Sequence, residues 1–297
     1  MDKKYELMET DYDGFYRIKA LKDFQLITGE IIKAGDLGGR IQGEHNLSQE
    51  GNCWIGYNAR AYDNSMVKDN AVMKDSSEAY GNSTVSGNAV MKDFSTIWDF
   101  STISGNAVMK DFSKIWDFST VSGNSVMKDY SWAHNNSTIS GNAVMKDWSR
   151  VYNSSTVSGN ALLQAYQTIR YGTVTTDLLG TKDWAGALYA ELGVKPKNNK
   201  IVLYKRVRST DDPDVFKSNY DKNFLYKIGE TVVTEDVDDN ILNVCTSGLH
   251  FTNLEFLSDY DGDVILECEV EVPDITTILN SQVRTRKCKV LRVYKEE

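Results

Sequence analysis

An 18-residue repeat in the middle of the chain constrains the fold more than any other feature. The string Ser-Gly-Asn recurs at this spacing and begins at Ser86, Ser104, Ser122, Ser140 and Ser158. The string Met-Lys-Asp recurs at the same spacing and begins at Met73, Met91, Met109, Met127 and Met145. A third series begins at Ala79, Ile97, Ile115, Ala133 and Val151. Together the three series form a continuous run of six-residue units over residues 55–174.

The residue types within each unit predict a short strand followed by a tight corner. The first position is aliphatic and the fifth is nearly always Ala or Ser, as at Ile97 and Ser101. Because side chains alternate along a strand, positions five and one share one side, which we expect to be the interior. The third position is Gly, Asp or Asn, the residues that best tolerate a left-handed backbone. Three strands per 18 residues therefore predict a three-sided coil, with coils stacked through parallel ladders.

The pattern resembles the hexapeptide-repeat family of left-handed parallel β-helices over residues 55–174. The resemblance implies a mostly β protein with a left-handed, triangular β-helix of 18 residues per coil. A right-handed solenoid or a set of unrelated short strands is the alternative. Residues 35–41 and 46–54 are similar to the N-terminal segment of acetyltransferase-like bacterial and phage proteins of this family. That similarity implies a β cap over the first coil, formed by residues 1–54. Such a cap protects an otherwise open strand edge.

The repeat ends after residue 174, and a different organisation follows. Residues 181–193 predict a helix that seals the last coil, with Thr181 as its N-cap and Gly193 at its end. Residues 175–200 therefore contain a capping helix and a linker. Residues 201–297 predict a C-terminal α+β domain. Its expected strands are rich in β-branched residues and cover residues 201–207, 231–234, 263–272 and 288–294, and its expected short helix covers 253–260.

Position four of the Ser-Gly-Asn units carries an asparagine in every repeat. Stacked coils bring these residues to one corner, where we expect a ladder of side-chain amides. Its expected members are Asn88, Asn106, Asn124, Asn142 and Asn160.

Three outward faces follow from the register, and one of them is rich in aromatic residues. We predict that this face binds a partner or ligand through Tyr80, Trp98, Trp116, Trp132, His134, Tyr152, Lys114 and Arg150. Long exposed aromatic strips are rare on monomers, so a homo-oligomer seam or the docking surface of the C-terminal domain is the first interpretation. A platform for a planar or anionic ligand is the second. The other two faces carry Thr and Ser rows, or Val and Lys rows beside Asp, and no metal site is predicted on them.

A short segment of the C-terminal domain suggests a second candidate site. Residues 247–251, Ser-Gly-Leu-His-Phe, are followed by Tyr260 and resemble an element of ADP-ribosyltransferase-type folds. The resemblance implies that Tyr204 lies on the first nucleotide-binding strand and that His250 and Tyr204 are the catalytic residues if the domain is an enzyme. Without the resemblance, the residues indicate that His250 is an ordinary strand residue and that the domain has no catalytic residue.

The composition of the chain argues against several classes of function. The formal charge is −9, which argues against DNA as a partner. No apolar run is long enough to span a membrane, and no secretory signal is apparent. The four Cys show no CxxC spacing, so we expect reduced thiols, a cytoplasmic location and neither a metal nor a cofactor.

The sequence therefore predicts a non-catalytic, homo-oligomeric scaffold of phage or prophage type. We expect it to present the aromatic face and the C-terminal domain to a host protein or a small nucleotide ligand. The alternative is a transferase, with either ADP-ribosyl transfer in the C-terminal domain or hexapeptide-type acyl transfer.

Overall fold

The computed structural model describes residues 3–10, 14–221 and 223–295. The chain forms two compact units. The first, here called the solenoid unit, comprises Met1–Gln164 and Gly172–Asp177. The second, the C-terminal unit, comprises Ala165–Tyr171 and Leu178–Glu297, so it also contains the segment that the sequence predicts to be a capping helix and linker.

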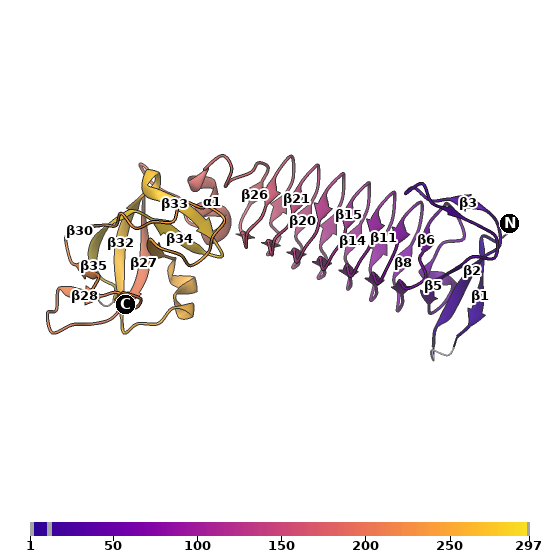
Figure 1. Ribbon diagram of the computed structural model, residues 1–297, viewed down its shortest axis with the longest axis horizontal. Helices are drawn as coiled ribbons and strands as arrows, with labels where there is room; N and C mark the ends of the chain where they lie inside the picture. Colours follow the sequence, from indigo (N-terminus) through magenta and orange to yellow (C-terminus); the bar gives the residue numbers. More distant parts are fainter. Residues whose placement is uncertain (1–2, 11–13, 222, 296–297) are drawn as a thin grey trace. The chain divides into compact units, whose positions relative to one another are not determined.

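The solenoid unit is a stack of coils, each with three short strands (Figure 1). The aromatic face is formed by β7 (Arg60–Ala61), β10 (Glu78–Ala79), β13 (Thr96–Ile97), β16 (Lys114–Ile115), β19 (Trp132–Ala133) and β22 (Arg150–Val151). The hydroxyl face is formed by β8 (Met66–Val67), β11 (Thr84–Val85), β14 (Thr102–Ile103), β17 (Thr120–Val121), β20 (Thr138–Ile139), β23 (Thr156–Val157) and β26 (Thr173–Val174). The lysine face is formed by β6 (Trp54–Ile55), β9 (Val72–Met73), β12 (Val90–Met91), β15 (Val108–Met109), β18 (Val126–Met127), β21 (Val144–Met145) and β24 (Leu162–Leu163).

The strands pair in parallel at an offset of one repeat, which confirms the predicted 18-residue coil. Thr96 pairs with Lys114 and Ile97 with Ile115, and the parallel strand pairs given for β6 to β24 follow the same rule. The last pair of the hydroxyl face differs, because Thr156 pairs with Thr173 at an offset of 17 residues. Ile97 and Ile115 are fully buried, as is Ser101 at position five. The interior is therefore a column of aliphatic side chains with small residues between them, as the alternation predicts.

The corners have the backbone conformation that their residue types predict. Asp99, Asp117 and Gly123, at position three, have φ angles of 56°, 53° and 69°. The predicted amide ladder is also present, with each Asn Nδ2 donating to the Oδ1 of the next coil. From Asn88 to Asn160 the four nitrogen-to-oxygen distances are 3.0, 2.9, 3.1 and 3.0 Å. One further asparagine, Asn70, extends the ladder by donating to Asn88 at 3.1 Å.

The N-terminal strands extend the sheet of the aromatic face. This sheet begins with β1 (Tyr5–Glu9) and β2 (Tyr16–Ala20), which are antiparallel, and β5 (Leu37–Ile41) then pairs in parallel with β7. A hairpin of β3 (Phe24–Gln25) and β4 (Ile31–Ile32) and the 3-10 turn η1 (Glu44–Asn46) complete the segment. Lys4 is buried, and its ammonium donates to the carbonyl oxygens of Glu50, Gly51 and Cys53. It therefore satisfies carbonyl groups just before β6.

The C-terminal unit consists of β25 (Thr168–Ile169), α1 (Trp184–Leu192) and several antiparallel sheets. The largest sheet has the order β27 (Lys200–Val207), β32 (Val264–Glu271), β35 (Lys287–Val293) and β30 (Thr231–Val233). A second sheet has the order β31 (Leu249–Phe251), β34 (Gln282–Thr285) and β33 (Ile275–Leu279). The remaining elements are the hairpin of β28 (Val215–Lys217) and β29 (Leu225–Lys227), and the 3-10 turns η2 (Leu254–Asp259) and η3 (Val272–Asp274).

One local prediction for this unit needs correction, and two others are confirmed. The helix begins at Trp184 with Asp183 as its N-cap, because the Asp183 carboxylate accepts from the Gly186 backbone N–H at 2.9 Å; the prediction of Thr181 was wrong. The short helix predicted at 253–260 is present as the 3-10 helix η2, Leu254–Asp259. The predicted end of α1 at Gly193 is confirmed by its left-handed φ of 69°. Within the described residues, no helix is long and apolar enough to cross a membrane.

Candidate ligand pocket and aromatic face

The aromatic face carries a continuous stack of rings along its central column. Tyr62, Tyr80, Trp98 and Trp116 stack in succession with nearly parallel planes, and their ring centres lie 5.0, 5.7 and 4.8 Å apart. His134 lies 4.3 Å from Trp116 in the same stack. The structure thus brings together the predicted column. Because the rings stack on one another, most of their faces are occupied and their edges point outward.

Two corner columns flank this stack. One contains Phe94, Phe112, Tyr130 and Trp148, with successive ring centres 5.0, 4.8 and 4.1 Å apart. The other contains Phe100 and Phe118, which stack at 4.7 Å and remain more than half exposed. Together the columns leave a broad apolar surface in contact with solvent, which is unusual for a monomer.

Three further residues of the face, Trp132, His134 and Arg150, carry nitrogen groups. Trp132 packs edge-on against Trp116, and the Arg150 guanidinium lies 4.8 Å from the centre of the Trp132 ring. His134 is half-buried and its Nδ1 has no hydrogen-bond partner among the described residues. Burial lowers the pKa of His134, so the imidazole is neutral at pH 7. A neutral ring held in a stack is a packing element rather than a poised general base.

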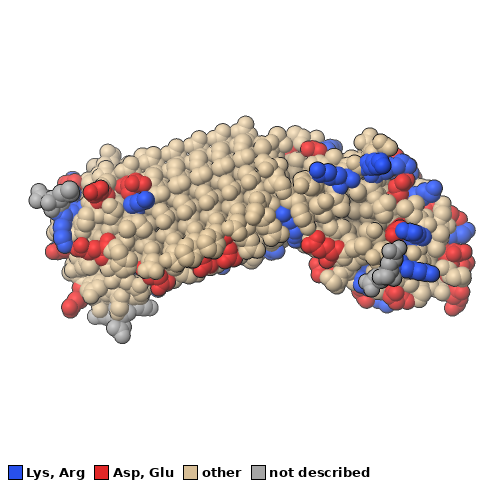
Figure 2. All heavy atoms as spheres, turned by 180° about the vertical axis from the view of Figure 1, so that it is seen from behind, with Lys and Arg blue, Asp and Glu red and all other residues tan. Residues whose placement is uncertain are grey.

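Charged side chains on the lysine face neutralise one another. Lys146 lies 3.0 Å from the Asp147 carboxylate, and Lys110 and Lys128 lie 3.8 Å from Asp111 and Asp129. Figure 2 shows one side of the coils, on which charged side chains gather along an edge and leave the middle free of them. Among the described residues, no group of His, Cys, Asp and Glu could hold a metal ion.

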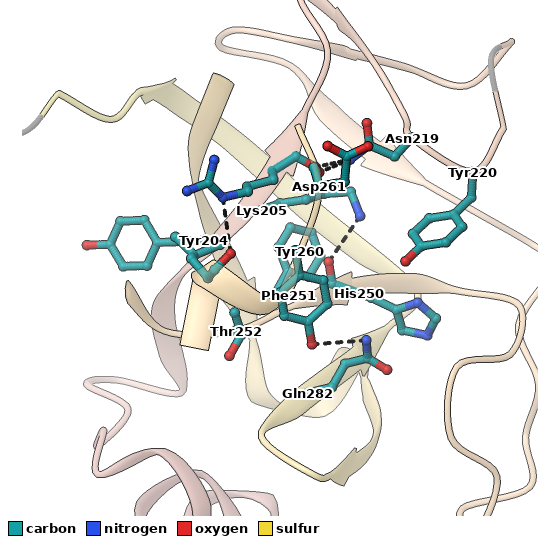
Figure 3. Close-up of a pocket in the computed structure, with 12 residues that line it drawn as sticks. Tyr204, Lys205, Asn219, Tyr220, His250, Phe251, Thr252, Tyr260, Asp261 and Gln282 are labelled. Atoms are coloured by element: carbon teal, nitrogen blue, oxygen red, sulfur yellow. Dashed lines mark hydrogen bonds between the residues drawn. The ribbon is translucent and has the colours of Figure 1, made fainter. Parts of the chain in front are cut away.

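The C-terminal unit contains a cavity at the junction of its two larger sheets. The backbone of Tyr204 on β27 bonds in both directions to Thr252, at 2.8 and 3.0 Å, which places β27 beside β31. A cavity of about 160 Å³ opens next to this junction (Figure 3). A larger cavity of about 550 Å³ lies beside it. Both cavities are lined by Lys205, Tyr220, His250 and Gln282.

Lys205 is the cationic centre of this pocket. Its Nζ donates to the His250 carbonyl oxygen at 3.1 Å and lies 5.5 and 5.6 Å from the ring centres of Tyr226 and Phe251. Among the described residues, no carboxylate lies within 4 Å of this ammonium. Burial lowers the pKa of Lys205 to about 8. The sheet thus holds a weakly solvated amine against aromatic rings at the wall of two cavities.

His250 lines both cavities and is neutral at pH 7. Burial, together with the nearby charges of Lys205 and Arg284, lowers the pKa of His250 to about 4. Its Nε2 is buried and has no hydrogen-bond partner among the described residues. The Asn219 side-chain oxygen, at the wall of the smaller cavity, is also without a partner in the described part of the chain. A buried polar atom without a partner is costly, so both atoms favour a polar ligand.

The two residues named for the enzyme alternative lie at the same pocket but do not face each other. Tyr204 packs edge-on against Tyr294, with ring centres 5.4 Å apart. Figure 3 shows the Tyr204 phenol and the His250 imidazole on opposite sides of the cluster. Tyr260 does point inward, and its hydroxyl accepts from Gln282 Nε2 at 3.2 Å. Burial raises the pKa of Tyr260 to about 12, so this hydroxyl stays protonated.

The sequence predicts Tyr204 and His250 as candidate residues of this site but does not predict Lys205. The sequence predicts Lys205 only as part of the strand at 201–207 and does not place it at a pocket. Asn219 and Gln282 carry no local motif. Leu203 and Val207 are fully buried, and Lys205 is two residues from each of them. Because residues two apart in a strand share one side, this spacing is the signal that places Lys205 on the inner side of the strand.

The comparisons with known proteins concern this part of the chain. Residues 194–255 match the model of a family of unknown function, DUF5758. The matched segment is about a fifth of the chain and includes Tyr204, Lys205, Tyr220 and His250. No curated protein matches the chain. The similarity therefore falls on the strands that line the pocket.

Proposed function

We propose that the protein is a non-catalytic binding protein with a rigid solenoid scaffold and a ligand pocket in its C-terminal unit. The ligand class is a small anionic molecule with a planar ring, and a nucleotide has this chemistry. The Lys205 ammonium carries the proposal, because it lines both cavities between two aromatic rings without a carboxylate partner among the described residues. An anionic group placed there gains a charge-assisted hydrogen bond in a weakly solvated site.

The other pocket residues suit the ring of such a ligand. Tyr220 is 84% exposed and borders both cavities, so its ring is free to stack on a planar group. The free Nε2 of His250 and the free side-chain oxygen of Asn219 supply hydrogen-bond partners for the edge of a base. These groups recognise a ligand through charge, stacking and hydrogen bonds.

Replacing Lys205 with Met is expected to weaken the binding of ADP about tenfold or more, since it removes a charge-assisted bond worth about 1.5 to 3 kcal/mol. Isothermal titration calorimetry on the full chain measures this change. Lys227→Met is the matched control, because Lys227 is an exposed lysine of the same unit that pairs with Glu230 at 2.7 Å. Equal affinities of the Lys205 and Lys227 variants, or no ADP binding by the wild type, would contradict the proposal.

The transferase alternative makes an opposite prediction about the same pocket. Tyr204 and His250 both border the smaller cavity, which is the observation in its favour. Turnover of labelled NAD that His250→Ala abolishes would support ADP-ribosyl transfer and reject the non-catalytic proposal. Turnover of acetyl-CoA would support acyl transfer.

We further propose that the aromatic face is the seam of a homo-oligomer. The exposed rings of Phe94 and Phe112 in one corner column, and of Phe100 and Phe118 in the other, form two apolar strips that a second copy of the chain would cover. We expect sedimentation velocity to show an oligomer for the wild type and a monomer for the double variant Phe112→Ser, Phe118→Ser. Thr120→Ser on the hydroxyl face is the control and should leave the oligomer intact. A monomeric wild type at tens of micromolar would overturn this assignment.

A further inference from the structure

The environment of Lys205 differs from that of lysines paired with carboxylates. Exposed lysines such as Lys33, Lys200 and Lys227 are hydrogen-bonded to carboxylates, which raise the pKa of each ammonium. Lys205 instead donates a hydrogen bond to the His250 carbonyl oxygen and has two aromatic neighbours. An amine in such surroundings is more often neutral, and a neutral amine is a nucleophile.

Burial alone does not give a lysine access to a ligand, as Lys4 shows. Lys4 is fully buried, whereas Lys205 is partly exposed, and burial lowers the pKa of both ammonium groups. However, the Lys4 Nζ donates to three backbone carbonyl groups, those of Glu50, Gly51 and Cys53. It lines none of the cavities described above, whereas Lys205 lines two. Only Lys205 of this pair combines an apolar environment with space for a reacting molecule.

We propose that Lys205 captures a carbonyl-containing ligand as a reversible imine. The Nζ lone pair attacks the carbonyl carbon, and the carbinolamine then loses water to form the carbon–nitrogen double bond. No electrons are transferred to or from another molecule, and water is the only leaving group. The ligand class is an aldehyde or ketone that also carries the ring and anionic group for which the pocket is suited. This inference uses the pocket of the proposed function and adds a covalent step to it.

His250 is placed to assist the loss of water. Its Nε2 is buried at the wall of the same two cavities and has no hydrogen-bond partner among the described residues. A neutral imidazole can pass a proton between the nitrogen of the carbinolamine and its departing hydroxyl group. His250 is therefore assigned as a positioning and proton-relay group, and Lys205 as the residue that forms the bond.

Reductive trapping tests the proposal on the full chain. The probe is pyridoxal 5′-phosphate, an aldehyde with a planar ring and a phosphate, added at less than one equivalent near pH 7.5 and reduced with borohydride. At this pH, a lysine with a pKa of about 8 has roughly a hundredfold more neutral amine than one at its ordinary value. We therefore expect peptide mass spectrometry to show at least about tenfold more modification at Lys205 than at Lys227.

Three variants complete the experiment. Lys205→Arg should abolish the dominant adduct and leave the weak labelling of other lysines unchanged, and Lys227→Arg should leave the Lys205 adduct intact. His250→Ala should slow trapping severalfold while the adduct stays on Lys205. Labelling spread over the lysines according to their exposure would overturn the proposal, and this result is read on the wild type without relying on any variant.

The imine proposal and the proposed nucleotide-binding function can be rejected separately. ADP has no aldehyde group, so ADP binding that depends on Lys205 without a dominant pyridoxal adduct supports the charge role and rejects the imine. A dominant Lys205 adduct without ADP binding supports the imine and rejects the nucleotide as the ligand class.

Discussion

Replacing Val121 with Asp is expected to abolish the native state of the solenoid unit. Val121 is fully buried and lies in the register between Ile103 and Ile139 of the neighbouring coils. A carboxylate at this point would be buried among aliphatic side chains and small residues, so the penalty reaches about 4 kcal/mol or more. Because domains are stable by about 5 to 15 kcal/mol, this single change removes much or all of the margin. Urea unfolding followed by far-UV circular dichroism measures the loss.

The adjacent residue provides a matched control. Thr120 is the other residue of β17, and its side chain is partly exposed on the hydroxyl face. Thr120→Asp adds the same charged group one residue away, and we expect a change within about 1 kcal/mol. Similar losses from both substitutions would show that the inward and outward positions are assigned incorrectly.

Much of the solenoid was predictable because each coil contacts only its neighbours. The pairing of Ile97 with Ile115 spans a single repeat, so the spacing in the sequence equals the register in space. The same logic explains why Asp99 and Gly123 could be placed at corners and why the asparagine ladder was found. The stacked orientation of the aromatic rings was not predictable, because it depends on rotamers that the repeat does not specify.

The C-terminal unit was less predictable because its contacts join distant segments. The bridge between Tyr204 and Thr252 connects residues far apart in the chain, and no repeat fixes their register. The strands rich in β-branched residues were found, and the strand assignment of His250 agrees with β31, whereas β33 and β34 were missed. The position of Lys205 in the pocket follows from that pairing, so a strand pattern alone could not show it.

The burial of Glu191 is a further feature that local sequence could not show, and it predicts a strong dependence of stability on pH. Glu191 lies on α1 and is fully buried. Its Oε2 accepts from the Ser281 backbone N–H at 3.0 Å, and its Oε1 has no hydrogen-bond partner among the described residues. Burial raises the pKa of Glu191 to about 8, although the Ser281 and Thr168 backbone groups and the Arg170 charge act in the opposite direction.

The sign of the effect follows from comparing the folded and unfolded chains. In the unfolded chain this carboxyl has its ordinary pKa of 4.5, so the folded state binds the proton more tightly. The protonated Glu191 carboxyl therefore contributes fully to the stability of the folded state below about pH 4.5. This contribution decreases as the pH rises and is lost by about pH 8. The full change amounts to about 5 kcal/mol, since each pKa unit is worth about 1.4 kcal/mol.

Glu191→Gln is expected to remove this dependence, because the amide keeps an oxygen for the Ser281 N–H and carries no charge at any pH. At pH 8 the variant should be more stable than the wild type by several kcal/mol, and at pH 5 the two should be nearly equal. Hydrogen exchange of peptides across α1, corrected for the intrinsic rate at each pH, measures the opening free energy of this unit. Glu230→Gln, at an exposed residue paired with Lys227, should retain the wild-type slope. A flat wild-type profile would instead mean that Glu191 is ionised in the native state, with the nearby Arg170 guanidinium and the Ser281 N–H balancing its burial.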